Sequence, residues 1–125
     1  MKYRKNNTVQ AKAYIDLDNL AGNYKRISEK IKPAQVIAVV KADGYGHGAI
    51  QVAKRLQEEG VEYFAVARLS EAIELNEEGI DQKILILGRI FPEEIEYAIK
   101  NKIRITLTNQ QDLKVINQKA QELDK

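Results

Sequence analysis

The chain has 125 residues, 44% of them hydrophobic and 30% charged, so it is long and apolar enough for one domain with its own core. Its 20 basic and 18 acidic residues are interspersed and leave a net charge of +2, which makes nucleic acid a poor candidate partner. The chain has no cysteine, which excludes disulfides, and only one histidine. It therefore has very few side chains that could ligate zinc or form a Ser/His/Asp triad. The absence of cysteine fits a cytoplasmic location, and no apolar run predicts a signal peptide or a membrane span.

The chain begins with a predicted lead-in, residues 1–33. After a polar arm, residues 9–15 predict a short strand. Asp16 or Asp18 can cap a helix whose apolar residues recur at helical spacing, and Pro33 ends that helix. The lead-in therefore supplies one strand and one helix ahead of the rest of the domain.

Four short apolar runs dominate residues 34–125. They lie at residues 36–40, 63–67, 84–87 and 103–107, with helix-length segments between them. Because the runs mostly lack in/out alternation, they predict strands covered on both faces, as in a parallel sheet. We therefore expect one α/β domain, residues 1–125, with four strand–helix units of either a β/α barrel or a doubly wound sheet.

Capping residues mark several helix ends. Gly60 is placed to end one helix, and Ser70 can cap the start of the next. Pro92 fits a first helical position. Thr108 and Gln111 have the spacing of a capping box for the last helix.

The stretch with chemical content is residues 36–48, VIAVVKADGYGHG. Lys41 closes the first apolar run in phase with Ile37 and Val39, so its side chain projects from the carboxyl end of that strand on their face. In a barrel that face lines the interior, whose mouth holds the active site. Lys41 is therefore the first candidate catalytic residue.

A lysine at such a place suits one kind of chemistry best. Its amine is protonated at neutral pH, so nucleophilic work requires desolvation or a neighbouring cation. Schiff-base formation with a carbonyl cofactor is the reaction that fits such a lysine. The glycines allow the backbone to approach a ligand, and Tyr45 offers a hydroxyl donor that can reach a phosphate.

The same residues also have plainer interpretations. A lysine at a strand end is more often a solvated charge, and the glycine-rich run fits a tight turn but not a dinucleotide fingerprint or a P-loop. His47 fits a loop or a helix start, and Asp43 an Asx turn. Arg68 and Arg89, each just past a strand, are interpreted as solvated.

Residues 38–49, AVVKADGYGHGA, resemble the cofactor-lysine signature of the alanine racemases, which depend on pyridoxal phosphate. Other segments resemble the same family in the same order, namely residues 13–20, residues 65–67 followed by Glu71 and Ala72, residues 84–88 and residues 105–108. The resemblance covers nearly the whole chain from Val9. It implies that the four parallel units form about half of a TIM-type (β/α)8 barrel.

The resemblance also implies roles for three residues. Lys41 would hold pyridoxal phosphate as a Schiff base and serve as one of two opposed acid/base groups, acting on the α-hydrogen of D-alanine. Tyr45 would donate a hydrogen bond to the cofactor phosphate, and Leu87 would line the cofactor wall. The reaction would interconvert L- and D-alanine in the cytoplasm and supply D-alanine for peptidoglycan.

The chain departs from the family pattern in what it lacks. The barrel's second half, with an arginine near the pyridine nitrogen, and a C-terminal domain with the opposing tyrosine have no counterpart in its 125 residues. We therefore expect an N-terminal fragment that is inactive alone, whose uncovered strand face promotes self-association, while the complete enzyme is a homodimer. Alternatives are a non-catalytic pyridoxal-phosphate-binding barrel module, a racemase of another amino acid such as serine or lysine, and a scaffold domain in which Lys41 is solvated.

Overall fold

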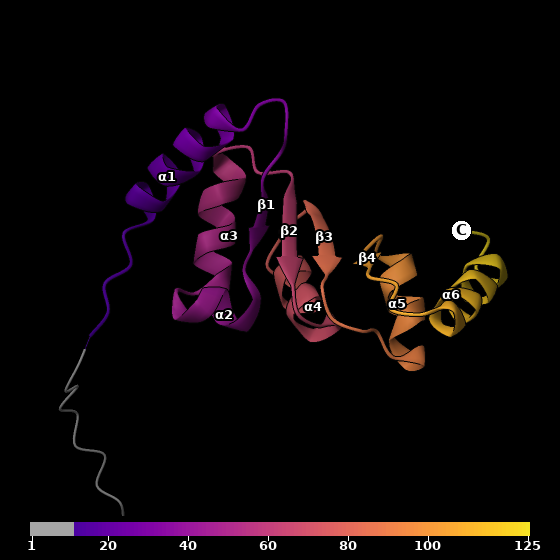
Figure 1. The fold of residues 1–125 in the computed structure, drawn as a ribbon. Helices are drawn as coiled ribbons and strands as arrows, with labels where there is room; N and C mark the ends of the chain where they lie inside the picture. Colours follow the sequence, from indigo (N-terminus) through magenta and orange to yellow (C-terminus); the bar gives the residue numbers. More distant parts are fainter. Residues whose placement is uncertain (1–11) are drawn as a thin grey trace, which may run out of the picture.

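The structure, a computed structural model that describes residues 12–125, is built around one parallel sheet (Figure 1). Its strands are β1 (Ile37–Val39), β2 (Tyr63–Val66), β3 (Lys83–Ile86) and β4 (Arg104–Ile105), paired side by side in chain order. The helices are α1 (Leu17–Lys30), α2 (Lys41–Gly46), α3 (Ala49–Glu58), α4 (Leu69–Glu77), the 3-10 helix η1 (Pro92–Glu94), α5 (Ile95–Lys100) and α6 (Gln110–Glu122).

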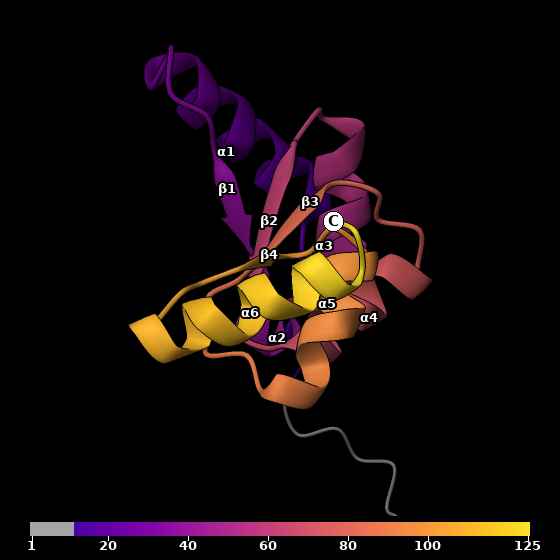
Figure 2. The ribbon, with the colours of Figure 1, turned by 90° about the vertical axis from the view of Figure 1, so that its right-hand side faces the viewer.

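One face of the sheet, here called the outer face, carries the hydrophobic core. Phe64 and Val66 of β2 and Ile84 and Ile86 of β3 are buried on this face. Helices α3, α4 and α5 lie on this side, as Figure 2 shows. Each such side chain contributes about 1.5–3 kcal/mol by leaving water. Burial on this face therefore fixes the strand–helix units against one another.

The opposite face, here called the inner face, is left uncovered by helices. Strand alternation gives it Ile37 and Val39, which keep 47% and 39% of their surface exposed. Leu87, just past β3, is 43% exposed. Helices on one face only are typical of a barrel wall, whereas a doubly wound sheet is covered on both. The fold is thus about half of a TIM-type barrel, as the family resemblance implied.

The four strands predicted within residues 34–125 all form, but the structure differs from expectation at the lead-in strand and at two helix caps. Of the predicted strand at residues 9–15, residues 9–11 lie outside the described part of the chain, and residues 12–15 form no strand. Helix α4 begins at Leu69 with Arg68 as its N-cap, so the prediction that Ser70 caps it was wrong. A carboxylate in the first turn, described below, satisfies the Arg68 amide instead.

The cap of α6 was predicted one residue too early. Asn109, not Thr108, is the N-cap, because its side-chain oxygen accepts a hydrogen bond from the Asp112 amide at 2.8 Å. The other predicted caps form. Asp16 caps α1 by accepting from the Asn19 amide at 2.9 Å, and Pro92 opens η1.

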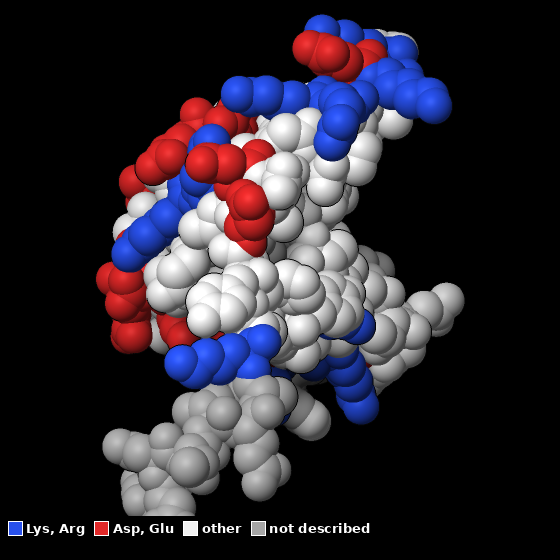
Figure 3. Space-filling model, turned by 90° about the vertical axis from the view of Figure 1, so that its left-hand side faces the viewer, with Lys and Arg blue, Asp and Glu red and all other residues white. Residues whose placement is uncertain are grey.

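Helix α1 is fastened to α3 by a cluster of charges. Arg55 of α3 pairs with Asp18 of α1 at 3.2 Å and with Glu59, and Lys25 of α1 reaches Glu59 at 2.6 Å. Hydrogen bonds from Lys25 and then Arg55 hold the pKa of Glu59 below its ordinary value. Figure 3, which views the molecule from this side, shows both signs of charge beside each other around an uncharged area. Leu17, Leu20 and Tyr24 of α1 also pack against the core, so the lead-in helix is held by apolar contacts with ion pairs beside them.

Candidate functional site

The candidate residues meet at the edge formed by the carboxyl ends of the strands. Leu87 follows β3 two residues after Leu85, so alternation places it toward the inner face. Lys41 follows Val39 by two residues, but Val40 between them is not extended (ψ 17°), so Lys41 is placed at the carboxyl end of β1. Val39 and Leu85 both pair with Ala65 of β2, which puts them at one level. Lys41 and Leu87 are thus two strands apart, on the order of 10 Å by strand spacing. The Lys41 side chain is half-buried there.

The chain makes an unusual turn directly after Lys41. Ala42, Asp43, Gly44 and Tyr45 all have left-handed backbone angles, with φ between 52° and 61°. For the three residues other than glycine, this conformation costs about 1–2 kcal/mol each. Strain of this kind persists only where the surrounding structure enforces it, and it clusters at functional sites. The turn is therefore the strongest geometric sign of a site in the described chain.

Hydrogen bonds within the loop enforce the turn. The Gly44 amide donates to the Val40 carbonyl at 2.8 Å, and the Gly48 amide donates to the Asp43 carbonyl at 2.9 Å. The Asp43 carboxylate accepts from the Ala49 amide at 2.8 Å, which satisfies the first turn of α3. Asp43 therefore closes the turn onto the following helix. His47 lies in the loop as predicted, with Nδ1 3.0 Å from the Gly44 carbonyl oxygen.

The turn brings Tyr45 back toward Lys41. The Lys41 Nζ lies 6.0 Å from the centre of the Tyr45 ring, at the outer limit of a cation–π contact. Tyr45 is 60% exposed, so a ligand can reach it. An apolar hollow of about 290 Å³ adjoins the ring and lies between α1, β1 and α3, and Lys41 is not among the residues that line it. Two of the three predicted site residues, Lys41 and Tyr45, are thus brought together, and Leu87 lies along the same edge.

A carboxylate that the residue pattern did not single out for a role also lies at this edge. Glu71, in the first turn of α4, accepts hydrogen bonds from the Ala42 amide at 2.8 Å and the Ala67 amide at 2.7 Å. It also accepts from the Arg68 amide at 3.3 Å. Burial alone would raise the pKa of Glu71, but these amides outweigh it and lower the pKa below its ordinary value. Its signal in the sequence is an acidic residue at the third position of a helix.

The two arginines of the edge differ in their partners. Arg89 is not simply solvated, since it pairs with Asp112 at the start of α6 at 3.0 Å. Hydrogen bonds from the Thr108 hydroxyl and then Arg89 lower the pKa of Asp112. Arg68 is exposed, as expected. The pair of Arg89 and Asp112 therefore ties the loop after β3 to α6.

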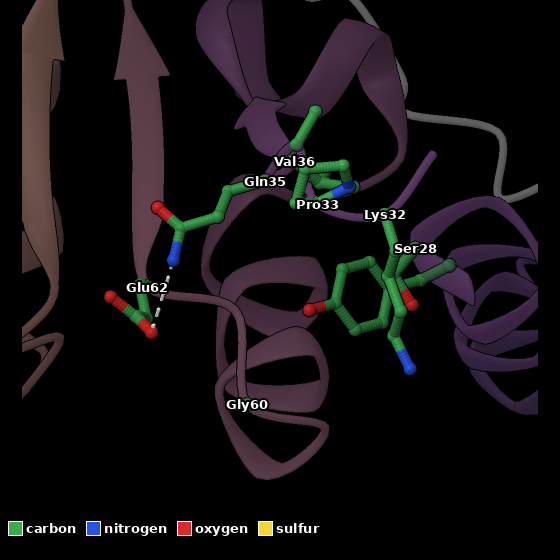
Figure 4. Close-up of a pocket in the computed structure, with 9 residues that line it drawn as sticks. Ser28, Lys32, Pro33, Gln35, Val36, Gly60 and Glu62 are labelled. Carbon is green, nitrogen blue, oxygen red and sulfur yellow. Dashed lines mark hydrogen bonds between the residues drawn. The ribbon is translucent and has the colours of Figure 1, made fainter. Parts of the chain in front are cut away.

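A second hollow, of about 340 Å³, lies at the opposite end of the sheet. Figure 4 shows Gln35 and Glu62, which precede β1 and β2, with the Gln35 amide donating to the Glu62 carboxylate at 3.4 Å. Active sites of barrels lie at the carboxyl ends of the strands, so this hollow is not the candidate site. Among residues 12–125, no group of three or more His, Asp or Glu side chains could hold a metal ion. None of the helices in that range is long and apolar enough to cross a bilayer.

Comparisons with known proteins agree with this geometry. An alanine racemase of Macrococcus caseolyticus is 46% identical over 93 residues, which are 74% of this chain and 24% of that protein. The structure of alanine racemase from Clostridium difficile 630 superposes with a TM-score of 0.79 at 42% identity, covering 87% of this chain and 29% of that one. A histidine racemase from Leuconostoc mesenteroides gives a TM-score of 0.79 at 25% identity, over 86% of this chain and 29% of that one.

The chain spans about a quarter of the length of the curated relatives it matches. The family described as "Alanine racemase, N-terminal domain" matches residues 15–125, which is nearly the whole chain. Both the match and the half-barrel fold include the strained turn after Lys41. The chain therefore belongs to the alanine racemase N-terminal domain family.

Proposed function

We propose that this chain is the part of an amino-acid racemase, with alanine as substrate, that holds pyridoxal phosphate on Lys41. The observation that carries the proposal is the left-handed turn of residues 42–45, which costs several kcal/mol and brings Tyr45 next to Lys41. Family membership gives the reaction class. On the same resemblance, the product D-alanine would serve peptidoglycan and the complete enzyme would be a cytoplasmic homodimer.

The side chains at the carboxyl edge fit that cofactor. Lys41 offers a half-buried amine for the aldehyde. The Tyr45 hydroxyl can donate to the phosphate from an exposed position. The exposed apolar surface of Leu87 can lie against the ring. These three residues would therefore hold the cofactor at the reactive carbon, the phosphate and the ring.

When bound, pyridoxal phosphate withdraws electrons from the α-carbon of the amino acid and so acidifies the α-hydrogen. Lys41 Nζ would take this proton from D-alanine, or return it, on one face of the α-carbon. Inversion needs a second group on the opposite face. We propose that this group comes from outside residues 12–125, since the chain spans about a quarter of its relatives.

The proposal is tested by cofactor binding. Pyridoxal phosphate added to this chain should show the visible absorbance band of the cofactor bound to a lysine amine. Lys41→Ala should abolish this band. Lys114→Ala, an exposed lysine of α6, is the matched control and should leave the band unchanged. A band that survives in Lys41→Ala would contradict the assignment of the cofactor lysine.

The alternatives separate in a second measurement. A chiral assay of D- and L-alanine tests for racemisation, which we expect this chain not to perform alone. Racemisation by residues 1–125 would show that both acid/base groups lie within them. Binding without turnover even in a complete protein would favour the non-catalytic carrier. Because a histidine racemase shares the fold, histidine, serine and lysine belong in the same assay.

A further inference from the structure

Glu71 is a carboxylate of the carboxyl edge that joins two strand ends through their backbone amides and has no part in the proposed chemistry. Its two oxygens are divided between the strands. Oε1 accepts from the Ala42 amide after β1, and Oε2 accepts from the Ala67 amide after β2. Glu71 itself stands on α4, so a single carboxylate connects three elements.

The amide that Glu71 binds after β1 belongs to the peptide unit between Lys41 and Ala42. A peptide unit is planar, so fixing its N–H also fixes the ψ angle of Lys41. That angle is one of the two that set where the chain turns after the lysine. Ala42 is also the first left-handed residue of the strained turn, with φ of 52°. The Glu71 carboxylate is therefore placed to hold the backbone on both sides of this peptide.

A simple helix cap does not account for this arrangement. Capping α4 requires only the Arg68 amide, and that hydrogen bond, at 3.3 Å, is the longest of the three. The bond to the Ala42 amide crosses 29 residues of sequence and is 2.8 Å long. Bonds from amides to a carboxylate are roughly twice as strong as neutral ones. All three bonds have this strength in common, and the two shorter ones are those that reach the strand ends.

We propose that Glu71 is a positioning residue for Lys41: its carboxylate holds the Lys41–Ala42 peptide and the end of β2 so that the lysine stays in place for the cofactor. This inference rests on the proposed function of Lys41. Glu71 does not touch the reacting atoms in this scheme. It acts through the backbone, and its loss should free the lysine without removing any group that the cofactor contacts.

Three variants of the full chain separate these effects. In Glu71→Gln the side chain keeps its shape, but its NH₂ group meets an amide that also donates, so one hydrogen bond is lost. Glu71→Asp keeps the charge near the α4 N-terminus but is one methylene shorter and is expected not to span to Ala42. Glu74→Gln, on the exposed side of α4, is the matched control.

The first readout follows backbone amides, beginning with the unaltered chain. In the unaltered chain, the amide proton resonances of Ala42 and Ala67 should titrate together at acid pH with the Glu71 carboxylate. Amide hydrogen exchange at Ala42 should then be at least about tenfold faster in Glu71→Gln, as expected for a lost bond to a charged group. Exchange in the β3 core and the urea midpoint monitor whether the variant is folded.

The second readout is selectivity of labelling. Pyridoxal phosphate is added, its bonds to amines are fixed by borohydride reduction, and the modified lysines are mapped by mass spectrometry. We expect the share of label on Lys41 to fall by about tenfold in Glu71→Gln and Glu71→Asp, with the other lysines as an internal reference. Glu74→Gln should match the unaltered chain.

The outcomes distinguish failure of the Glu71 positioning role from failure of the proposed function of Lys41. If Lys41 is no more labelled than surface lysines in the unaltered chain, the proposed function fails. If Lys41 is labelled selectively and equally in the folded Glu71 variants, the positioning role is overturned. Ala42 and Ala67 amides that do not respond to the Glu71 titration would overturn it as well.

Discussion

Both faces of the sheet carry isoleucine and valine side chains, but these side chains end in different states on the two faces. Ile86 on the outer face is fully buried beneath the helices, whereas Ile37 on the inner face keeps about half of its surface exposed. Both are isoleucines in a parallel strand. The difference shows that hydrophobicity selects residues for burial, while the connections between strands decide which face is covered first. Right-handed crossovers put the consecutive helices on one side.

The inner face therefore keeps apolar surface that remains available for burial, beside Tyr63 with the Lys83 and Arg104 cations over its ring. It includes Val39 and Leu87 close to the candidate cofactor lysine. Exposed apolar surface of this kind marks interaction or ligand sites. The carboxyl edge of that face is also where the strained turn lies. The covered face thus supplies stability, and the open face supplies the candidate site.

The largest expected effect comes from making the same kind of substitution, isoleucine to alanine, once on each face. Ile86→Ala should lower the free energy of unfolding by about 2–5 kcal/mol, because it leaves a cavity under the helices. Ile37→Ala should cost less than about 1 kcal/mol, since half of that side chain is already in water. Urea denaturation of both variants measures the difference. Equal costs would mean that the inner face is covered in solution.

A glycine at the carboxyl edge gives the next largest effect. A Cβ built on Gly88 would lie 2.4 Å from the Ala67 carbonyl oxygen, so Gly88→Ala must push the ends of β2 and β3 apart. The expected loss is about 1–3 kcal/mol. Gly22→Ala in α1 meets nothing within 4 Å and should instead stabilise by about 0.5–1 kcal/mol. Thermal unfolding measures the stability change of both variants, and the two changes should have opposite signs.

Self-association tests whether the open face finds a partner. We predict that the chain associates through its inner face, because that face and two sheet edges are uncovered. Val39→Lys should weaken the association about tenfold or more, whereas Gln51→Lys on exposed α3 should not. Sedimentation at micromolar concentrations measures both. A sharply monomeric unaltered chain of ordinary thermal stability would count against the prediction.

The smallest effect concerns the charges that hold α1 on the covered side. The pKa of Glu59 is lowered by Lys25 and Arg55, so its contribution is present above the unfolded pKa, about 4.3. It is lost as pH falls through the lower folded value. Stability should therefore fall less between pH 5 and pH 3 in Glu59→Gln than in the unaltered chain. Glu29→Gln, an exposed residue of α1, should keep the full pH dependence.

Much of the fold was accessible from local patterns. The four apolar runs became the four strands, and their weak alternation is explained by a sheet that has apolar residues on both faces. The caps at Asp16 and Pro92 also followed from single residues. The predictions that Ser70 and Thr108 cap α4 and α6 were wrong. The position of an N-cap depends on where the chain enters the helix, and the preceding strand sets that point.

The sequence by itself determined the order of strands and helices and singled out Lys41 with its glycine-rich loop, because these signals are periodicities and motifs between near neighbours. The tertiary structure alone decided the left-handed course of residues 42–45 and the reach of Glu71 to Ala42. It also decided the contact that requires Gly88. These features join residues that are distant in the chain, and such residues meet only after register and crossover have placed the strand ends together.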